Sequence, residues 1–168
     1  MEESNVIIFC GLDGSGKTTQ AKKLLSYLES KKISSEYVWL RYPNFFSLPI
    51  AGFLRLFGVS GYPIPEEKKS QGLDDLSTHK NLKKLWIWSL YNDFKFVCWK
   101  KLLRPIKNKK ILILDRFVID TVVELAINTD QEDNFDSISK KFFKFIPNNS
   151  VIFFLDIDPK ISYERNHE

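Results

Sequence analysis

Residues 11–18 read Gly-Leu-Asp-Gly-Ser-Gly-Lys-Thr, and their spacing fits the phosphate-binding pattern G-x-x-x-x-G-K-[ST]. Glycines let the backbone curl closely around phosphate oxygens, and successive N–H groups then point inward as an anion cradle. In this pattern Lys17 reaches the β- and γ-phosphates, and the hydroxyl of Thr18 ligates Mg²⁺. The alternative is a glycine-rich turn between a strand and a helix that binds no ligand.

The segments on both sides of this loop agree with the phosphate-binding interpretation. An apolar run over residues 6–10 precedes it, and a helical pattern with Ala21, Leu24, Leu25 and Leu28 on one face follows it. A helix that begins near Lys17 adds the positive end of its dipole to the cradle. We therefore expect one continuous segment to bind ATP: Gly11, Leu12, Asp13, Gly14, Ser15, Gly16, Lys17, Thr18 and Thr19.

Charged residues also end the later predicted strands. Asp115 closes the run Ile-Leu-Ile-Leu-Asp, which is typical of a carboxylate that holds Mg²⁺ or its water shell; the alternative is a cap of the next helix. Arg116 and Arg41 follow strands as well, and guanidinium groups bind phosphate oxygens through paired hydrogen bonds. The alternative for each arginine is a surface ion pair. Because the carboxyl ends of parallel strands share one rim, we expect these residues to converge on the loop.

Two further side chains are candidates for substrate contacts. Asp13 lies inside the loop, where its carboxylate repels phosphate, so it either accepts a hydrogen bond from a substrate hydroxyl or stabilises the turn. Trp86, Trp88 and Tyr91 lie at helical spacing in a predicted long helix. One of them is able to stack on a flat base, although such a stripe is more often part of a core.

Apolar strand-like runs alternate with helical patterns along the chain, which indicates a parallel sheet covered on both faces. The expected strands are 5–11, 36–41, 111–115 and 151–155. The expected helices are 17–32, 50–57, 74–103, one from Arg116 to about 128, one around 138–146, and one after Asp158-Pro159. Asp74 or Asp75 would cap the long helix, Pro105 would end it, and 130–136 would be a loop. The predicted fold class is α/β, a three-layer P-loop NTPase fold with about four to five parallel strands flanked by helices.

Length and composition set the outer limits. A chain of 168 residues predicts a single domain over 1–168, and 43% hydrophobic residues suffice for a sizeable core. The 25 basic and 21 acidic residues give a mixed surface with net charge +4, which does not favour a nucleic acid polymer as partner. Cys10 and Cys98 look like small buried hydrophobes without a disulfide framework. The acidic N-terminus does not fit a signal peptide, and no apolar run approaches the roughly 20 residues that span a bilayer, so we expect a cytoplasmic protein without membrane association.

Four segments together resemble thymidylate kinases and their close relatives. They are residues 9–20, Leu40-Arg41-Tyr42-Pro43, Leu114-Asp115-Arg116-Phe117 and residues 153–159. Their order and spacing cover nearly the whole chain. An aspartate two residues after the first glycine, combined with the later Asp-Arg-Phe, is more specific than the loop alone.

The resemblance implies transfer of the γ-phosphoryl group of MgATP to a nucleoside monophosphate, with dTMP giving dTDP as the expected reaction. By this resemblance Asp13 meets the deoxyribose 3′-hydroxyl, Arg41 and Arg116 clamp the acceptor phosphate, and Trp88 stacks on the base. Lys17, Asp115 and Arg116 would be the catalytic residues, with ATP and Mg²⁺ as cofactors and Thr18 and Asp115 on the metal. Members of this family are usually cytoplasmic homodimers.

The sequence also departs from the family's pattern. Some members carry an arginine where this chain has Gly14, and others supply it from a lid after the fourth strand, near Arg165 here. The lid, last strand and last helix have no counterpart before Glu168, so we expect a truncated or shortened relative. Residues 117–123 lack the serine-and-glutamine pattern typical of dTMP kinases. The alternatives are therefore a non-catalytic or weakly active ATP-binding protein, or a kinase for a different small acceptor.

Overall fold

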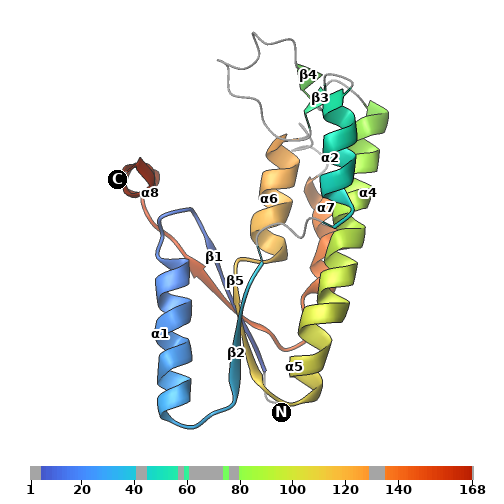
Figure 1. The fold of residues 1–168 in the computed structure, drawn as a ribbon. Coiled ribbons are helices and arrows are strands. Elements are labelled where there is room, and N and C mark those ends of the chain that lie inside the picture. Colours follow the sequence, from blue (N-terminus) through green and yellow to red (C-terminus); the bar gives the residue numbers. More distant parts are fainter. Residues whose placement is uncertain are drawn as a thin grey trace. The chain divides into compact units, whose positions relative to one another are not determined.

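The fold is described from a computed structural model that covers residues 5–40, 45–56, 59–60, 74–75, 80–128 and 135–167 (Figure 1). The chain divides into two compact units. The first unit comprises Met1–Arg41, Cys98–Asp120 and Phe143–Glu168, and the second comprises Tyr42–Val97 and Thr121–Phe142. Each unit is described below by itself, and the expected single domain over 1–168 stays a prediction.

The first unit contains a four-stranded parallel sheet in the order β2-β5-β1-β6, which confirms the predicted α/β class with a parallel sheet flanked by helices. The strands are β1 (Val6–Gly11), β2 (Ser35–Trp39), β5 (Ile111–Asp115) and β6 (Val151–Leu155). The helical elements of this unit are α1 (Lys17–Ser30), the π-helical turn η2 (Cys98–Leu102), α5 (Leu103–Lys107), the 3₁₀ turn η4 (Phe143–Phe145) and α8 (Pro159–His167).

Apolar side chains alternate between the two faces of the sheet. On one face, Phe9 and Ile113 pack with Ala21 and Leu28 of α1, at the apolar positions that the helical pattern predicts. The intervening residues Ile8, Leu112 and Leu114 point to the other face and are fully buried. Burial on both faces explains why β5 is a continuous apolar run rather than an alternating one.

The strand order places a topological switch between β1 and β5. After β1 the chain continues to β2 at one edge of the sheet, and after β5 it continues to β6 at the opposite edge. In open parallel sheets, ligands bind at such a switch, beyond the carboxyl ends of the two strands. Here those ends are Gly11 and Asp115, so the loop 11–16 and Asp115-Arg116 lie where open parallel sheets bind their ligands.

The second unit is built from helices. It contains α2 (Ser47–Leu56), α4 (Lys80–Val97), α7 (Phe135–Phe142), most of α6 (Val118–Asn128), and the short parallel pair β3 (Val59–Ser60) and β4 (Asp74–Asp75). Its core includes Phe94 of α4 and Phe142 of α7, whose rings meet edge to face with centroids 5.8 Å apart. Across the described parts of the chain, no helix is both long and apolar enough to cross a membrane.

Two predictions about helix boundaries are wrong, and a third is wrong at its last two residues. Asp74 and Asp75 form strand β4 and do not cap the long helix, which is first described at Lys80. That helix does not end at Pro105 but continues through η2 and α5 to Lys107. Pro105 is tolerated because it lies in the first turn of α5, directly after the π-helical turn has interrupted the i to i−4 ladder. The predicted loop 130–136 falls mostly outside the described residues, but Asp136 lies in the first turn of α7.

Candidate active site

The loop between β1 and α1 has the geometry of a closely curled backbone. Gly11, Gly14 and Gly16 all have positive φ angles, of 137°, 76° and 90°. At Gly11 a Cβ atom would collide with the backbone carbonyl oxygen of Leu155 on the neighbouring strand β6. The glycine spacing therefore has two physical reasons, a left-handed backbone and the close approach of β6.

No side chain caps the N-terminus of α1 in the described structure. The N-cap residue is Gly16, whose carbonyl oxygen accepts the first helical hydrogen bond from the N–H of Gln20 at 2.9 Å. The first turn contains no acidic residue. Such a helix end presents N–H groups and the positive end of its dipole to the space inside the loop.

Lys17 folds back into this loop. Its side chain is buried, and its Nζ donates hydrogen bonds to the carbonyl oxygens of Gly11 (2.6 Å) and Leu12 (2.5 Å). An ion pair with Asp13 Oδ1 lies at 3.6 Å. Burial, and after it the nearby positive charge of Arg116, lowers the pKa of Lys17, whereas Asp120 and Asp13 oppose this shift. The site therefore holds a partly desolvated cation beside an open helix N-terminus.

Arg116 and Asp13 form an ion pair at the rim of the sheet. The Nη2 of Arg116 donates to Asp13 Oδ1, with the arginine side chain 13% exposed and the aspartate side chain 37% exposed, so in this structure Arg116 forms a partly buried ion pair. Arg116 has a left-handed backbone with φ of 62°, and its N–H donates to the carbonyl of Phe9 at 3.0 Å. This conformation turns the chain sharply at the end of β5, and it brings a guanidinium to the loop.

Asp115 is fully buried at the carboxyl end of β5. Its Oδ2 accepts a 2.6 Å hydrogen bond from the hydroxyl of Tyr37, while Oδ1 is buried with no partner among the described residues. Burial, and then the hydrogen bond to Asp115, raises the pKa of Tyr37, so the tyrosine remains a donor. An unpaired buried carboxylate oxygen fits an oxygen-preferring cation such as Mg²⁺, and the exposed hydroxyl of Thr18 is the second predicted ligand.

Sequence reasoning assigned no role to Asp120, in the first turn of α6. Burial raises the pKa of its carboxyl, against the opposing influence of Lys17, Arg116 and the backbone N–H of Gly11. Its Oδ2, like the hydroxyl of Ser15, is buried with no hydrogen-bond partner in the described structure. The sequence signal for this side chain is an acidic residue in the first turn of the helix that follows Asp115-Arg116, where the helix dipole favours negative charge. Orphaned buried polar atoms on several segments around one loop call for a physical explanation, and a bound ligand is one.

Helix α8 also contacts the loop. Ser162 is buried and its hydroxyl donates to the carbonyl oxygen of Asp13, while Arg165 Nη1 donates to the carbonyl oxygen of Gly14 at 3.2 Å. The predicted cap of this helix is confirmed, because Asp158 Oδ1 accepts from the N–H of Lys160 at 2.8 Å. Helix α8, which follows β6, therefore holds the loop through hydrogen bonds to two of its backbone carbonyl groups.

The structure brings together most of the predicted site residues but not all of them. Lys17, Asp13 and Arg116 meet at the carboxyl ends of β1 and β5, and Asp115 precedes Arg116 at the end of β5. Leu12, Thr18 and Thr19 belong to the same loop and helix start and are exposed. Arg41 lies outside the described residues. Trp88 belongs to the second unit and is 58% exposed on α4, and Trp86 on the same helix is buried.

The comparison with known protein families gives no assignment, since no family model matches the chain. Nor do three or more His, Cys, Asp or Glu side chains gather as a metal-binding group anywhere in the described ranges.

The two cysteines are free, and burial raises the pKa of Cys10 to about 11 and that of Cys98 to about 12, so both thiols stay protonated at neutral pH.

Proposed function

We propose that this chain is a nucleoside monophosphate kinase of the P-loop fold, which transfers the γ-phosphoryl group of MgATP to an acceptor, expected to be dTMP. One observation carries the proposal: an uncapped helix N-terminus with a buried lysine lies beside the buried Asp115 and the half-buried Arg116 at the switch point of a parallel sheet. Anionic ligands bind at uncapped helix N-termini, and switch points are where open α/β sheets bind ligands.

The loop residues would act by positioning and by charge stabilisation, since phosphoryl transfer asks little covalent chemistry of the protein. The N–H groups of the loop and of the first turn of α1 would bind the phosphate oxygens. The Nζ of Lys17, now 2.5–2.6 Å from two loop carbonyls, would move a short distance to the β- and γ-phosphates. Its desolvated state makes a phosphate a strong partner, because anionic contact restores the favourable environment that burial removed.

Mg²⁺, when bound, would neutralise charge on the β- and γ-oxygens. Asp115 Oδ1 and the hydroxyl of Thr18 are the oxygens that would hold it or its water shell. The hydrogen bond from Tyr37 occupies the other carboxylate oxygen and so fixes the orientation of Asp115.

Arg116 would bind the acceptor phosphate through its guanidinium. Its ion pair with Asp13 holds the planar group at the rim in the free protein, which lowers the entropy lost on binding. A phosphate at Arg116 lies on the same rim as the loop, so donor and acceptor phosphates would be held close together. Asp13 would accept a hydrogen bond from the acceptor's sugar hydroxyl.

A coupled assay of ADP release with a panel of nucleoside monophosphates tests the proposal. We expect the chain to release ADP in an acceptor-dependent manner, fastest with dTMP, and to lose this activity in an Arg116→Ala variant that still binds ATP. Isothermal titration with MgATP runs in parallel. ATP binding without acceptor-dependent turnover would reject the kinase and leave a nucleotide-binding protein, and absence of binding would reject the site itself.

A further inference from the structure

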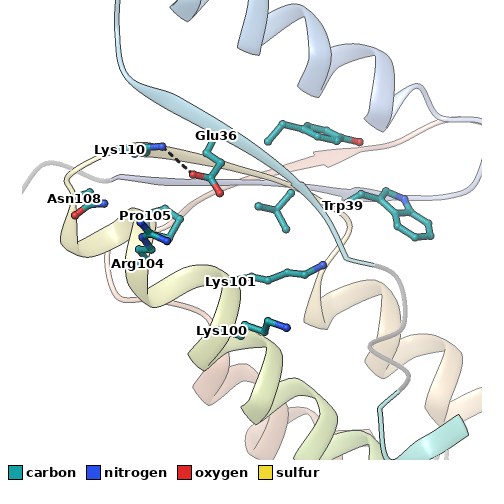
Figure 2. A pocket seen from close by; sticks show the side chains of 10 residues that line it. Glu36, Trp39, Lys100, Lys101, Arg104, Pro105, Asn108 and Lys110 are labelled. Carbon is teal, nitrogen blue, oxygen red and sulfur yellow. Dashed lines mark hydrogen bonds and ion pairs between the residues drawn. The ribbon is translucent and has the colours of Figure 1, made fainter.

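A second concave site lies away from the loop, beside the edge strand β2. A cavity of about 710 Å³ opens between β2 and the segment formed by η2 and α5, all within the first unit (Figure 2). Its volume is in the range of small-molecule sites. It has no lining residue in common with the site at the carboxyl ends of β1 and β5, apart from Tyr37, whose hydroxyl donates to Asp115.

Cationic side chains dominate one wall of this cavity. Lys100, Lys101, Arg104 and Lys110 line it, against a single carboxylate, that of Glu36. Glu36 is neutralised by its ion pair with Lys110, whose Nζ lies 3.1 Å from Oε2. Lys101 and Arg104 are exposed and form no ion pair within the described residues. The cavity therefore carries an excess of positive charge that its own residues do not balance.

The π-helical turn η2 contains two of these cations, Lys100 and Lys101. It inserts an extra residue per turn before Pro105, and the change of register rotates the following side chains relative to an ordinary helix. Figure 2 shows Lys100 and Lys101 extended in the same direction, with their ammonium groups toward the end of the cavity where Trp39 lies. The Glu36–Lys110 pair lies at the other end. Isolated π-turns within helices frequently mark functional sites.

The remaining lining indicates what kind of anion fits. The indole of Trp39 is 53% exposed and offers a face on which a flat ring can stack. Val38 and Pro105 add apolar surface, and Asn108 adds a hydrogen-bonding group. Guanidinium and ammonium groups next to an aromatic surface match a molecule that carries several negative charges and a planar heterocycle.

We infer that this cavity is a second nucleotide site, with the phosphates of the ligand at Lys101 and Arg104 and its base on Trp39. Inorganic anions alone would use the cations but not the indole, so a nucleotide is favoured over them. The inference does not depend on the kinase assignment, because no residue of the loop takes part. A nucleotide would therefore bind beside β2 whether or not the loop is occupied.

Nuclear magnetic resonance titration with ATP tests the inference, with the full chain labelled with ¹⁵N. The wild type and a Lys17→Ala variant should both show saturable shifts of the Trp39 indole N–H and of the Lys101 and Arg104 amides. A Lys101→Gln/Arg104→Gln double variant should weaken this binding at least about tenfold, since it removes two charge-assisted contacts. Unchanged amide shifts of β1 and β5 would show that the double variant is folded.

A Lys107→Gln/Lys109→Asn variant is the matched control, because it removes two exposed lysines of the same turn that do not line the cavity. It should retain the wild-type affinity. Sulfate at equal ionic strength should leave the Trp39 indole unmoved. Equal weakening in the control variant, equal shifts with sulfate, or shifts confined to the loop 11–17 would each overturn the inference. The last outcome would leave the proposed kinase site intact.

Discussion

Helices α1 and α2 begin in opposite ways. Asp93, a fully buried residue of α4, fills the N-terminus of α2: its Oδ1 accepts from the N–H groups of Phe45 (3.1 Å) and Phe46 (2.6 Å), and its Oδ2 accepts from that of Ser47 (3.0 Å). The N-terminus of α1 begins at Gly16 with no side-chain cap. Both helix ends attract negative charge, but of the two only the N-terminus of α2 is capped by a carboxylate of the described residues, that of Asp93.

The difference separates a structural helix end from one suited to a ligand. Three hydrogen bonds to one buried carboxylate satisfy donors that otherwise remain unpaired, so Asp93 secures α2 within its unit. At α1 no side chain takes such a place in the described structure, and the first helical residue, Lys17, pairs with carbonyl oxygens and with Asp13. An external anion is the partner that the proposed function assigns to this second helix end.

Removing the carboxylate at α2 should have the largest effect on stability. We expect Asp93→Ala to lower the free energy of unfolding by roughly 3–5 kcal/mol, since it removes the acceptor of three N–H groups, of which that of Ser47 is buried and the other two are partly buried. Urea denaturation measures the loss, and hydrogen exchange at Phe45, Phe46 and Ser47 should accelerate strongly. Asp93→Asn keeps one side-chain oxygen as an acceptor, so its free energy of unfolding should lie between that of the wild type and that of Asp93→Ala. A loss below about 1 kcal/mol for Asp93→Ala would mean that the filled helix end contributes little.

Removing the cation at α1 should instead affect ligand binding and turnover. We expect Lys17→Ala to lower kcat/KM of the proposed reaction by about 10²–10³-fold, the range found when a charge-stabilising donor is removed from a site. Unfolding free energy should change little or rise, because the variant no longer buries a cation. Coupled ADP release and thermal unfolding on the same samples separate the two effects. Retained turnover would contradict the assignment of Lys17 to the phosphates.

Two glycine substitutions sharpen the comparison further. Gly11→Ala should destabilise the first unit by roughly 2–4 kcal/mol, since a Cβ would collide with the Leu155 carbonyl and φ is 137°. The matched control is Gly52→Ala in the middle of α2, where the Cβ meets no atom within 4 Å and where alanine should stabilise by about 0.5–1 kcal/mol. Urea midpoints of both variants test the contrast. Equal effects of the same sign would show that the packing of β6 against Gly11 is unimportant.

The sequence allows prediction of the sheet and of the loop because both have local signals. The apolar run before Asp115 and the glycine spacing at 11–16 depend only on neighbouring residues. The cap of α2 was not predicted, since Asp93 lies 46 to 48 residues from the N–H groups that it accepts from. Long-range pairing of this kind has no sequence signature within a single window.

The helix boundaries that failed have the same origin. Asp74 and Asp75 have the residue type of a helix cap, but pairing with β3 determines their conformation. Pro105 has the type of a helix terminator, but the preceding π-helical turn accommodates it. Asp120 was overlooked because its environment comes from Lys17, Arg116 and Gly11, which only the assembled sheet brings near.

Asp120 provides the smallest test, one that turns on the pH dependence of stability. Its pKa is raised in the folded chain, so between its ordinary value and the folded value the native state binds more protons than the unfolded state. Stability contributed by this group is therefore present below the ordinary aspartate pKa and is lost as pH rises through the folded pKa. We expect Asp120→Asn to unfold at higher urea than the wild type at pH 7, because the amide is not charged. The gap between the two proteins should close as the pH falls below about 4, where the carboxyl is neutral in both states. A gap that widens on acidification would mean that the charged carboxylate stabilises the loop, and that Asp120 serves the N-terminus of α1 much as Asp93 serves that of α2.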